Sequence, residues 1–198
     1  VAMDMWEPYL QSTVAHVPAA ADKVVHDPFH LVQYMNAAVN EVRKAEHRRL
    51  LAQGDGILKG TRQLWLYAME NVPAAAAARF DQVKYINLQT SRAWAIKEVF
   101  RGFWLCADAD EARQHFAQWY GWAIRSRPPP VKKVARMFKR HLANILTFFT
   151  HRLTNGPLEG LNNKIQGLIK KAFGYRNKER FKTDVLFHLG GLDLHPAL

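Results

Sequence analysis

The spacing of apolar residues changes once along the chain. Near the amino terminus, residues 1–5 and the pair Val24-Val25 form two short apolar runs, and an amphipathic stretch over residues 7–17 separates them. This order predicts strand, helix, strand. From Leu31 onward apolar residues recur every three or four positions, which is typical of helices. The predicted fold class is therefore an α/β remnant followed by mostly α structure.

Breaks in the helical period divide the rest of the chain. The helix that starts near Leu31 should end at the Gly54-Asp-Gly56 turn, because glycine favours the conformations that end helices. Proline residues 128–130 form a second break. Asn177 is a suitable cap for a last helix. Further helices are expected at 74–83, 96–103, 112–123, 134–148 and 158–172.

The charge is concentrated in one segment. The chain of 198 residues carries a net charge of +11. Residues 131–182 hold thirteen Lys or Arg against two acids, so this segment accounts for the excess. A set of basic residues that only faces solvent is the alternative explanation. The excess of Lys and Arg over acids runs through several helices, however, and this favours contact with nucleic acid. The single cysteine, Cys106, excludes an internal disulfide and a zinc site built from several cysteines.

The chain is expected in the cytoplasm, with no membrane partner. No apolar run reaches the 18 or more residues of a membrane span, and Asp4 and Glu7 interrupt any signal peptide. The chain begins with Val1 inside what reads as a strand end. We therefore expect a fragment or a truncated reading frame, with removal of an initiator Met as the alternative.

Three acidic positions are candidates for chemistry. Glu159 falls in the first turn of the helix that Pro157 begins, where an acid also complements the helix dipole. Asp4 and Asp27 each follow an apolar strand, a common place for metal ligands or catalytic acids in α/β folds. Helix capping is the alternative for Asp4. His30, close to Asp27, is more typical of a structural residue than of a zinc ligand.

Several motifs together resemble a known family. They look like the DDE transposases of bacterial insertion sequences, in the branch that we write IS-L-three. The block around Glu159, joined to Gly174-Tyr-Arg-Asn177, is the most specific part. The motifs are Asp4-Met-Trp-x-x-Tyr9, Pro18-x-Ala20, Asp27-x-Phe-His30, residues 62–65, Ser91-x-Ala93-Trp94-x-x-Lys97-Glu98, Asn155-Gly-x-x-Glu159-Gly-x-Asn162-Asn163-Lys164, Gly174-Tyr-Arg-Asn177 and Phe181.

The resemblance implies an RNase H-like fold with a large helical insertion. The expected domains are a partial core over residues 1–40, a helical insertion over 41–150, and the last catalytic and carboxy-terminal helices over 151–198. Such enzymes hold two Mg²⁺ or Mn²⁺ ions with two aspartates and a glutamate. Asp4 matches the second aspartate and Glu159 the glutamate. The first aspartate is expected upstream of Val1, so the chain alone should be inactive.

The same resemblance assigns further roles. Asp27, His30, Asn155, Asn162 and Asn163 accompany the catalytic acids in the motifs. Trp94 is a candidate for stacking on an unpaired base, although core packing is the favoured role. The residues expected to contact the DNA backbone are Lys97, Lys164, Lys170, Lys171, Arg176 and Lys178.

The expected function is metal-dependent DNA strand cleavage and transfer by the full-length parent. Its partners would be DNA, as transposon ends and target, and further copies of the protein, in a bacterial nucleoid-associated location. The alternative is a basic helical remnant that binds DNA without catalysis. A helical RNA-binding or scaffold protein is a third hypothesis, and it leaves Asp4 and Glu159 without a shared role.

Overall fold

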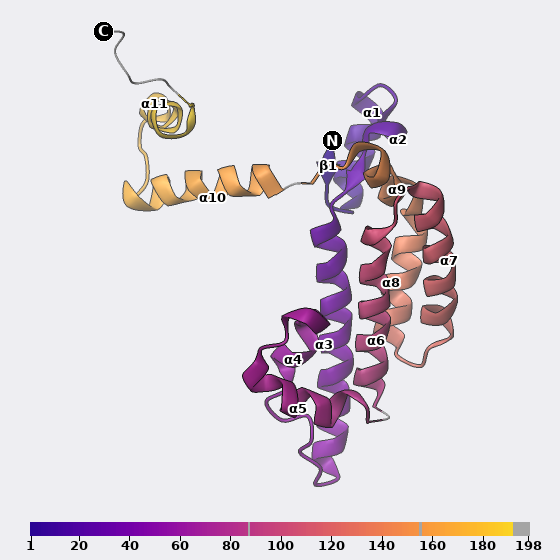
Figure 1. The fold of residues 1–198 in the computed structure, drawn as a ribbon. Helices are drawn as coiled ribbons and strands as arrows, with labels where there is room; N and C mark the ends of the chain where they lie inside the picture. The colour runs from indigo at the N-terminus through magenta and orange to yellow at the C-terminus, as the bar shows by residue number, and fades with distance from the viewer. Residues whose placement is uncertain (87, 155, 192–198) are drawn as a thin grey trace. The chain divides into compact units, whose positions relative to one another are not determined.

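The computed structural model describes residues 1–86, 88–154 and 156–191 (Figure 1). The chain divides into two compact units, Val1–Leu153 and Thr154–Leu198, and each is described by itself. The division falls close to the expected boundary between residues 150 and 151. The other expected boundary, between residues 40 and 41, lies inside one continuous helix, α3 (Pro28–Ala52).

The first unit opens with a small parallel sheet. Strand β1 (Ala2–Met3) pairs with β2 (Val25–His26), with Met3 opposite His26. Helices α1 (Glu7–His16) and α2 (Ala20–Lys23) connect the strands. The strand–helix–strand prediction is confirmed, with α2 as an unanticipated extra turn. The described residues form this sheet and no larger one, so an RNase H-like core stays a prediction.

Helix α3 is the central element of the first unit. The Asp27 side chain caps it by accepting a hydrogen bond from the Phe29 N–H at 2.8 Å, and Pro28 occupies its first turn. The helix ends before Gly54, whose φ of +80° favours glycine. The apolar stripe is buried as the period predicts, and its members include Leu31, Met35, Ala38 and Val42.

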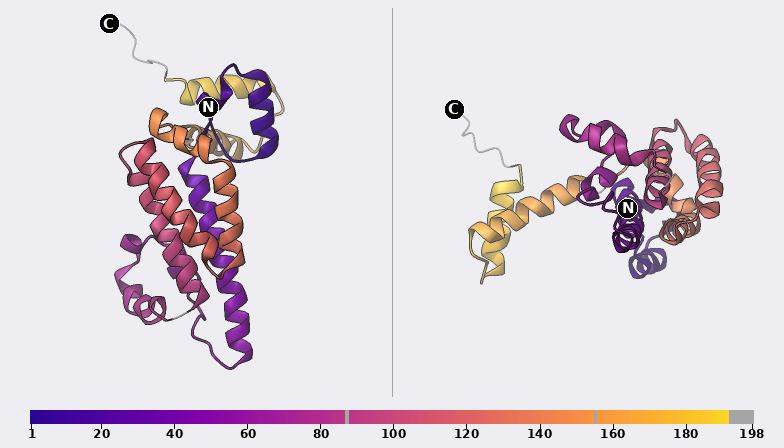
Figure 2. Two further views of the ribbon diagram at one scale, coloured as in Figure 1. Left: turned by 90° about the vertical axis from the view of Figure 1, so that its right-hand side faces the viewer. Right: turned by 90° about the horizontal axis from the view of Figure 1, so that it is seen from below.

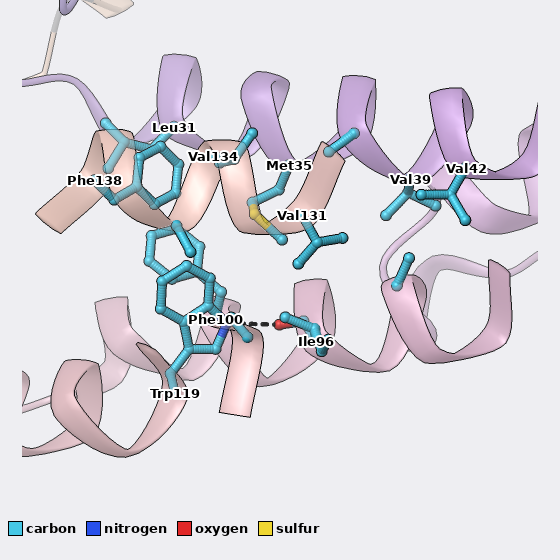
Figure 3. Close-up of a cluster of buried hydrophobic side chains, with 14 of the residues drawn as sticks. Leu31, Met35, Val39, Val42, Ile96, Phe100, Trp119, Val131, Val134 and Phe138 are labelled. Carbon is cyan, nitrogen blue, oxygen red and sulfur yellow. Dashed lines mark hydrogen bonds between the residues drawn. The ribbon is translucent and has the colours of Figure 1, made fainter. Parts of the chain in front are cut away.

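Three further helices complete the core, namely α6 (Gln89–Arg101), α7 (Ala109–Arg125) and α8 (Pro129–Arg140). Helices α6 and α8 pack along α3, whereas α7 packs against α6 and α8. Figure 3 shows side chains of α3, α6 and α8 meeting between the helices, with Trp119 of α7 closing the cluster. Trp119 Nε1 donates to the Ile96 carbonyl at 2.9 Å, so its one polar atom is satisfied inside the core.

Smaller elements complete the first unit. Helices α4 (Arg62–Leu66) and α5 (Ala74–Lys84), with the short turn η1 (Met69–Asn71), lie toward the end remote from the strands (Figures 1 and 2). The turn η2 (Gly102–Leu105) extends α6. None of the described helices is both long and apolar enough to cross a membrane.

One predicted helix is in fact two. The period over residues 134–148 predicts a single helix, whereas α8 ends at Arg140 and α9 (Leu142–His151) starts after His141. The break lets α9 pack against the strands, where Thr147 Oγ1 donates to the Val24 carbonyl at 2.6 Å. Continuous apolar spacing therefore did not reveal a bend that tertiary contacts stabilise.

The second unit contains helices α10 (Gly156–Lys171) and α11 (Lys178–Leu189). The turn between them places Phe173 and Gly174 at positive φ. Asn177 caps α11 as predicted, accepting from the Glu179 and Arg180 N–H groups. The expected buried side of α10 is only partly covered within this unit: Leu161 is exposed, and Ile165, Leu168 and Ile169 are half-buried.

Candidate functional site

Asp4 lies at the carboxyl end of the parallel strand pair. Its Oδ1 accepts hydrogen bonds from the Met5 N–H at 2.7 Å and from the Tyr34 hydroxyl of α3 at 3.3 Å. Burial and the negative charge of Asp4 together raise the pKa of Tyr34, so the phenol stays protonated and remains a donor. The half-buried carboxylate is thus held in position by a neighbouring helix.

Asp27 occupies the equivalent position on the neighbouring strand, because Met3 is opposite His26. It is buried, and its Oδ1 caps α3. His30, half-buried in the first turn of α3, has Nδ1 within 3.4 Å of Gln33 Oε1. Asp27 therefore has a clear structural role at the start of α3, and its part in the transposase motif stays a prediction.

Two histidines lie beside this strand edge. His26 is fully buried, with Nδ1 3.4 Å from the Met3 carbonyl and its ring 5.3 Å from that of His141. Burial is the main cause that lowers the pKa of His26 to about 4; the nearby His141 lowers it too, whereas the Met3 carbonyl and Asp4 oppose the shift. His26 is therefore neutral at neutral pH.

This shift predicts a pH-dependent stability. The unfolded chain binds a proton on His26 below about pH 6.5 and the folded chain does not, so stability is highest above that pH and falls toward pH 4. The slope from this one group should be about 1.4 kcal/mol per pH unit. Urea unfolding at several pH values should show a weaker dependence in His26→Gln. The exposed control His16→Gln should keep the slope, and an unchanged slope in His26→Gln would contradict the assignment.

Glu159 lies in the first turn of α10, as predicted, and is half-buried. Asn162, Asn163 and Lys164 follow it and are exposed. Asn155, the first residue of this motif, lies outside the described residues. Because Asp4 belongs to the first unit and Glu159 to the second, the expected pairing of their carboxylates stays a prediction.

The basic residues of the second unit are available to solvent. The side chains predicted to contact DNA there are all exposed, and they are Lys164, Lys170, Lys171, Arg176 and Lys178. Exposed Lys and Arg on helices are the groups that contact phosphates without reading bases. Their position is consistent with the predicted role.

Lys97 is a correction to the predicted DNA contacts. The residue is 1% exposed and its ammonium donates to the Trp65 carbonyl at 3.1 Å and the Tyr67 carbonyl at 2.6 Å. It also pairs with Glu98 at 3.0 Å. Burial lowers the pKa of Lys97, and the charge of Glu98 opposes this. Lys97 therefore joins the α4–η1 connection to α6 inside the unit, and it offers no charge to DNA.

Trp94 has the packing role that the sequence favoured. Its ring makes edge contacts with Trp65 at 6.5 Å and Phe80 at 5.1 Å between centroids, as part of an aromatic cluster joining α4, α5 and α6. The ring is half-buried against the core. These contacts are those of core packing, and a stacking role for Trp94 stays a prediction.

The donor chemistry fits a magnesium site only in part. Carboxylate oxygens are the hard ligands that Mg²⁺ prefers, and Asp4 presents them at a strand end. Within the described residues, however, no group of three or more His, Cys, Asp or Glu side chains could share a metal ion. Asp4 is thus suited to be one ligand of a site that needs further carboxylates.

Sequence reasoning missed Tyr34 as a residue that holds Asp4. A signal was present, because Tyr34 follows Asp27 by seven residues and so lies two turns into a helix that starts at the strand edge. The pairing of His26 with His141 carried no such signal, since 115 positions separate the two histidines in the sequence. Contacts of this second kind depend on how α8 and α9 pack.

Comparison with known proteins identifies the family. A family model described as Transposase, of the DDE ISL3 type, matches residues 1–185. The transposase for insertion sequence element IS1001 of Bordetella parapertussis is 30% identical over 184 residues, 91% of this chain and 45% of that protein. The transposase for IS1557 of Mycobacterium tuberculosis is 28% identical over 134 residues, 68% of this chain and 30% of that protein.

The match therefore covers most of this chain but only part of each relative. This chain spans less than half the length of these curated relatives. No solved structure gave a significant match. Since the family model covers both strands and all helices up to the middle of α11, the chain belongs to the ISL3-type transposase family of insertion sequences.

Proposed function

We propose that this chain is the carboxy-terminal catalytic part of an insertion-sequence transposase, which cuts and transfers DNA strands with divalent metal ions in the full-length parent. The observation that supports it best is the family match over residues 1–185, because it includes both Asp4 and Glu159. In this proposal the two acids are metal ligands, and the third carboxylate comes from a strand upstream of Val1.

The residues of the site would have distinct tasks. Bound Mg²⁺ would stabilise the attacking and leaving oxygens of the phosphodiester. Tyr34 holds the Asp4 carboxylate in place through the 3.3 Å hydrogen bond. Asn162 and Asn163 follow Glu159 on α10 and would donate amide hydrogen bonds to phosphate oxygens. Lys164 would add positive charge beside the same phosphates.

A proximity experiment tests the pairing of the two acids. In a Cys106→Ala background, Asp4→Cys and Glu159→Cys should be joined in high yield by a thiol crosslinker that spans about 8 Å, the reach that two ions about 4 Å apart require. Glu41→Cys with Glu159→Cys is the control, because Glu41 is exposed in the middle of α3. No crosslink in the first pair, or equal yields in both, would overturn the proposed site.

One observation favours the non-catalytic alternative. Within the described residues the carboxylates do not form a three-ligand cluster, and Asp27 caps a helix. A remnant that only binds DNA would have the same exposed cations. Strand cleavage by the full-length parent separates the two, because a remnant keeps the fold without the reaction; the crosslink instead tests the RNA-binding or scaffold hypothesis, which leaves Asp4 and Glu159 without a shared role.

A further inference from the structure

Helix α8 carries a stripe of positive charge that the motifs do not explain. Its apolar residues Val131, Val134, Ala135 and Phe138 are buried, and no acid occurs in the helix. The five basic residues lie within one arc of the helix, since they are spaced by one, three or four positions. They are Lys132, Lys133, Arg136, Lys139 and Arg140, which we call the α8 stripe.

The stripe lies on a helix that is packed into the core, and its charges form no ion pair within the described residues. The helix packs along α3 and α7 through its apolar face. In the part of the chain that the structure describes, none of the five side chains forms an ion pair with an acid. Lys139 lies 4.8 Å from the centre of the Tyr120 ring of α7, a contact that holds it without neutralising its charge.

The carboxyl end of the stripe meets the strand edge that carries Asp4. Arg140 and His141 line a cavity together with Met5 and Glu7, the residues that follow Asp4. The His141 ring also contacts the His26 ring at the end of β2. The stripe therefore ends at a cavity lined by residues that follow the proposed catalytic carboxylate in the chain, all within the first unit.

We propose that the α8 stripe is a track for the phosphate backbone of duplex DNA, leading it to Asp4. This inference rests on the proposed function, which supplies DNA as the substrate. From residue 132 to 140 the helix rises about 12 Å, which matches about three to four phosphates along one strand. Flexible Lys and Arg side chains would contact these phosphates without reading base sequence.

The burial of the apolar face favours nucleic acid over a membrane. Helices that bind membrane surfaces insert an apolar face opposite their basic one. In α8 that face is already used, since Val131 and Phe138 are fully buried in the core. A partner of α8 must therefore be recognised by charge alone, and duplex DNA offers the densest regular array of negative charge.

The test is DNA binding by a charge-removal variant and a matched control. The stripe variant is Lys132→Gln, Lys133→Gln, Arg136→Gln and Lys139→Gln. The control removes four exposed cations from α3, α6 and α7, namely Lys44→Gln, Arg48→Gln, Arg92→Gln and Arg113→Gln. Both lose the same charge, and circular dichroism with thermal unfolding checks that both fold.

Fluorescence anisotropy with a random-sequence duplex, at salt concentrations from about 50 to about 200 mM, gives the readout. The stripe variant should bind at least about tenfold more weakly, and its log–log salt slope should be smaller by about 2 to 3.5 units, at about 0.9 per lost phosphate contact. The control should change less than about threefold. Equal loss in both variants would overturn the track, because net charge alone would then explain binding.

The outcome is independent of the catalytic proposal. If the Asp4–Glu159 crosslink fails while the stripe variant still loses DNA binding, the track stands and the catalytic assignment falls. If the crosslink forms and the stripe variant binds DNA like the control, the track falls and the catalytic assignment stands. Loss of binding to anionic phospholipid vesicles, with DNA binding unchanged, would also overturn the track in favour of a membrane surface.

Discussion

Asp4→Asn should abolish strand cleavage by the full-length parent that the proposed function implies. The substitution keeps the shape of the side chain but removes the negative charge through which a carboxylate holds Mg²⁺ strongly. Metal ions contribute several kcal/mol to stabilising such a transition state, so the rate should fall by about 10³-fold or more. Cleavage of a supercoiled plasmid that carries the transposon ends, in Mg²⁺ or Mn²⁺, measures this directly.

Asp27→Asn is the informative comparison, because Asp27 ends the neighbouring strand in the same register. Asparagine is also a good helix cap, so the start of α3 should be preserved. Cleavage should therefore persist in Asp27→Asn. If instead Asp4→Asn remained active while Asp27→Asn lost cleavage, the catalytic aspartate would be Asp27.

Trp119→Ala should cost the first unit about 3 to 5 kcal/mol of unfolding free energy. The Trp119 ring is 1% exposed, and its centroid lies 4.7 Å from that of Phe100 and 6.0 Å from that of Phe138 (Figure 3). Truncation removes these contacts and leaves a cavity where α6, α7 and α8 meet. Urea unfolding followed by far-ultraviolet circular dichroism gives the difference.

Tyr85→Ala is the matched aromatic control, since Tyr85 is 80% exposed. It should change the unfolding free energy by no more than about 0.5 kcal/mol. Similar losses for Trp119→Ala and Tyr85→Ala would mean that the helices do not pack around Trp119 as described. A loss confined to Trp119→Ala supports the core of the first unit.

The local pattern was sufficient for most elements. The period from Leu31 predicted α3, and the Gly54 turn predicted its end, because burial of one helix face requires apolar residues at that spacing. Asn177 was likewise predicted to cap the last helix on local grounds, because a cap bonds N–H groups only two or three residues further along the chain. The position of Asp4 after a strand was also readable, since one buried run and one polar residue define it.

Lys97 shows where the family motif misled the site prediction. As a cation in a motif that resembles the transposases, it suggested a DNA contact, but it lies four positions after Ala93 and three before Phe100, on the buried face of α6. Periodicity alone could have placed it in the core. What it could not supply is the reason why burial is tolerated, which is the pair of carbonyls at Trp65 and Tyr67 that accept hydrogen bonds from the Lys97 ammonium.

By itself the sequence determined the order of elements, the excess of positive charge and the family motifs, because each of these depends on neighbours within a few turns. Only the tertiary structure decided the break at His141, the hydrogen bond from Tyr34 to Asp4, and the approach of the α8 stripe to the strand edge. These depend on contacts between segments far apart in the chain, whose packing energies no local pattern records.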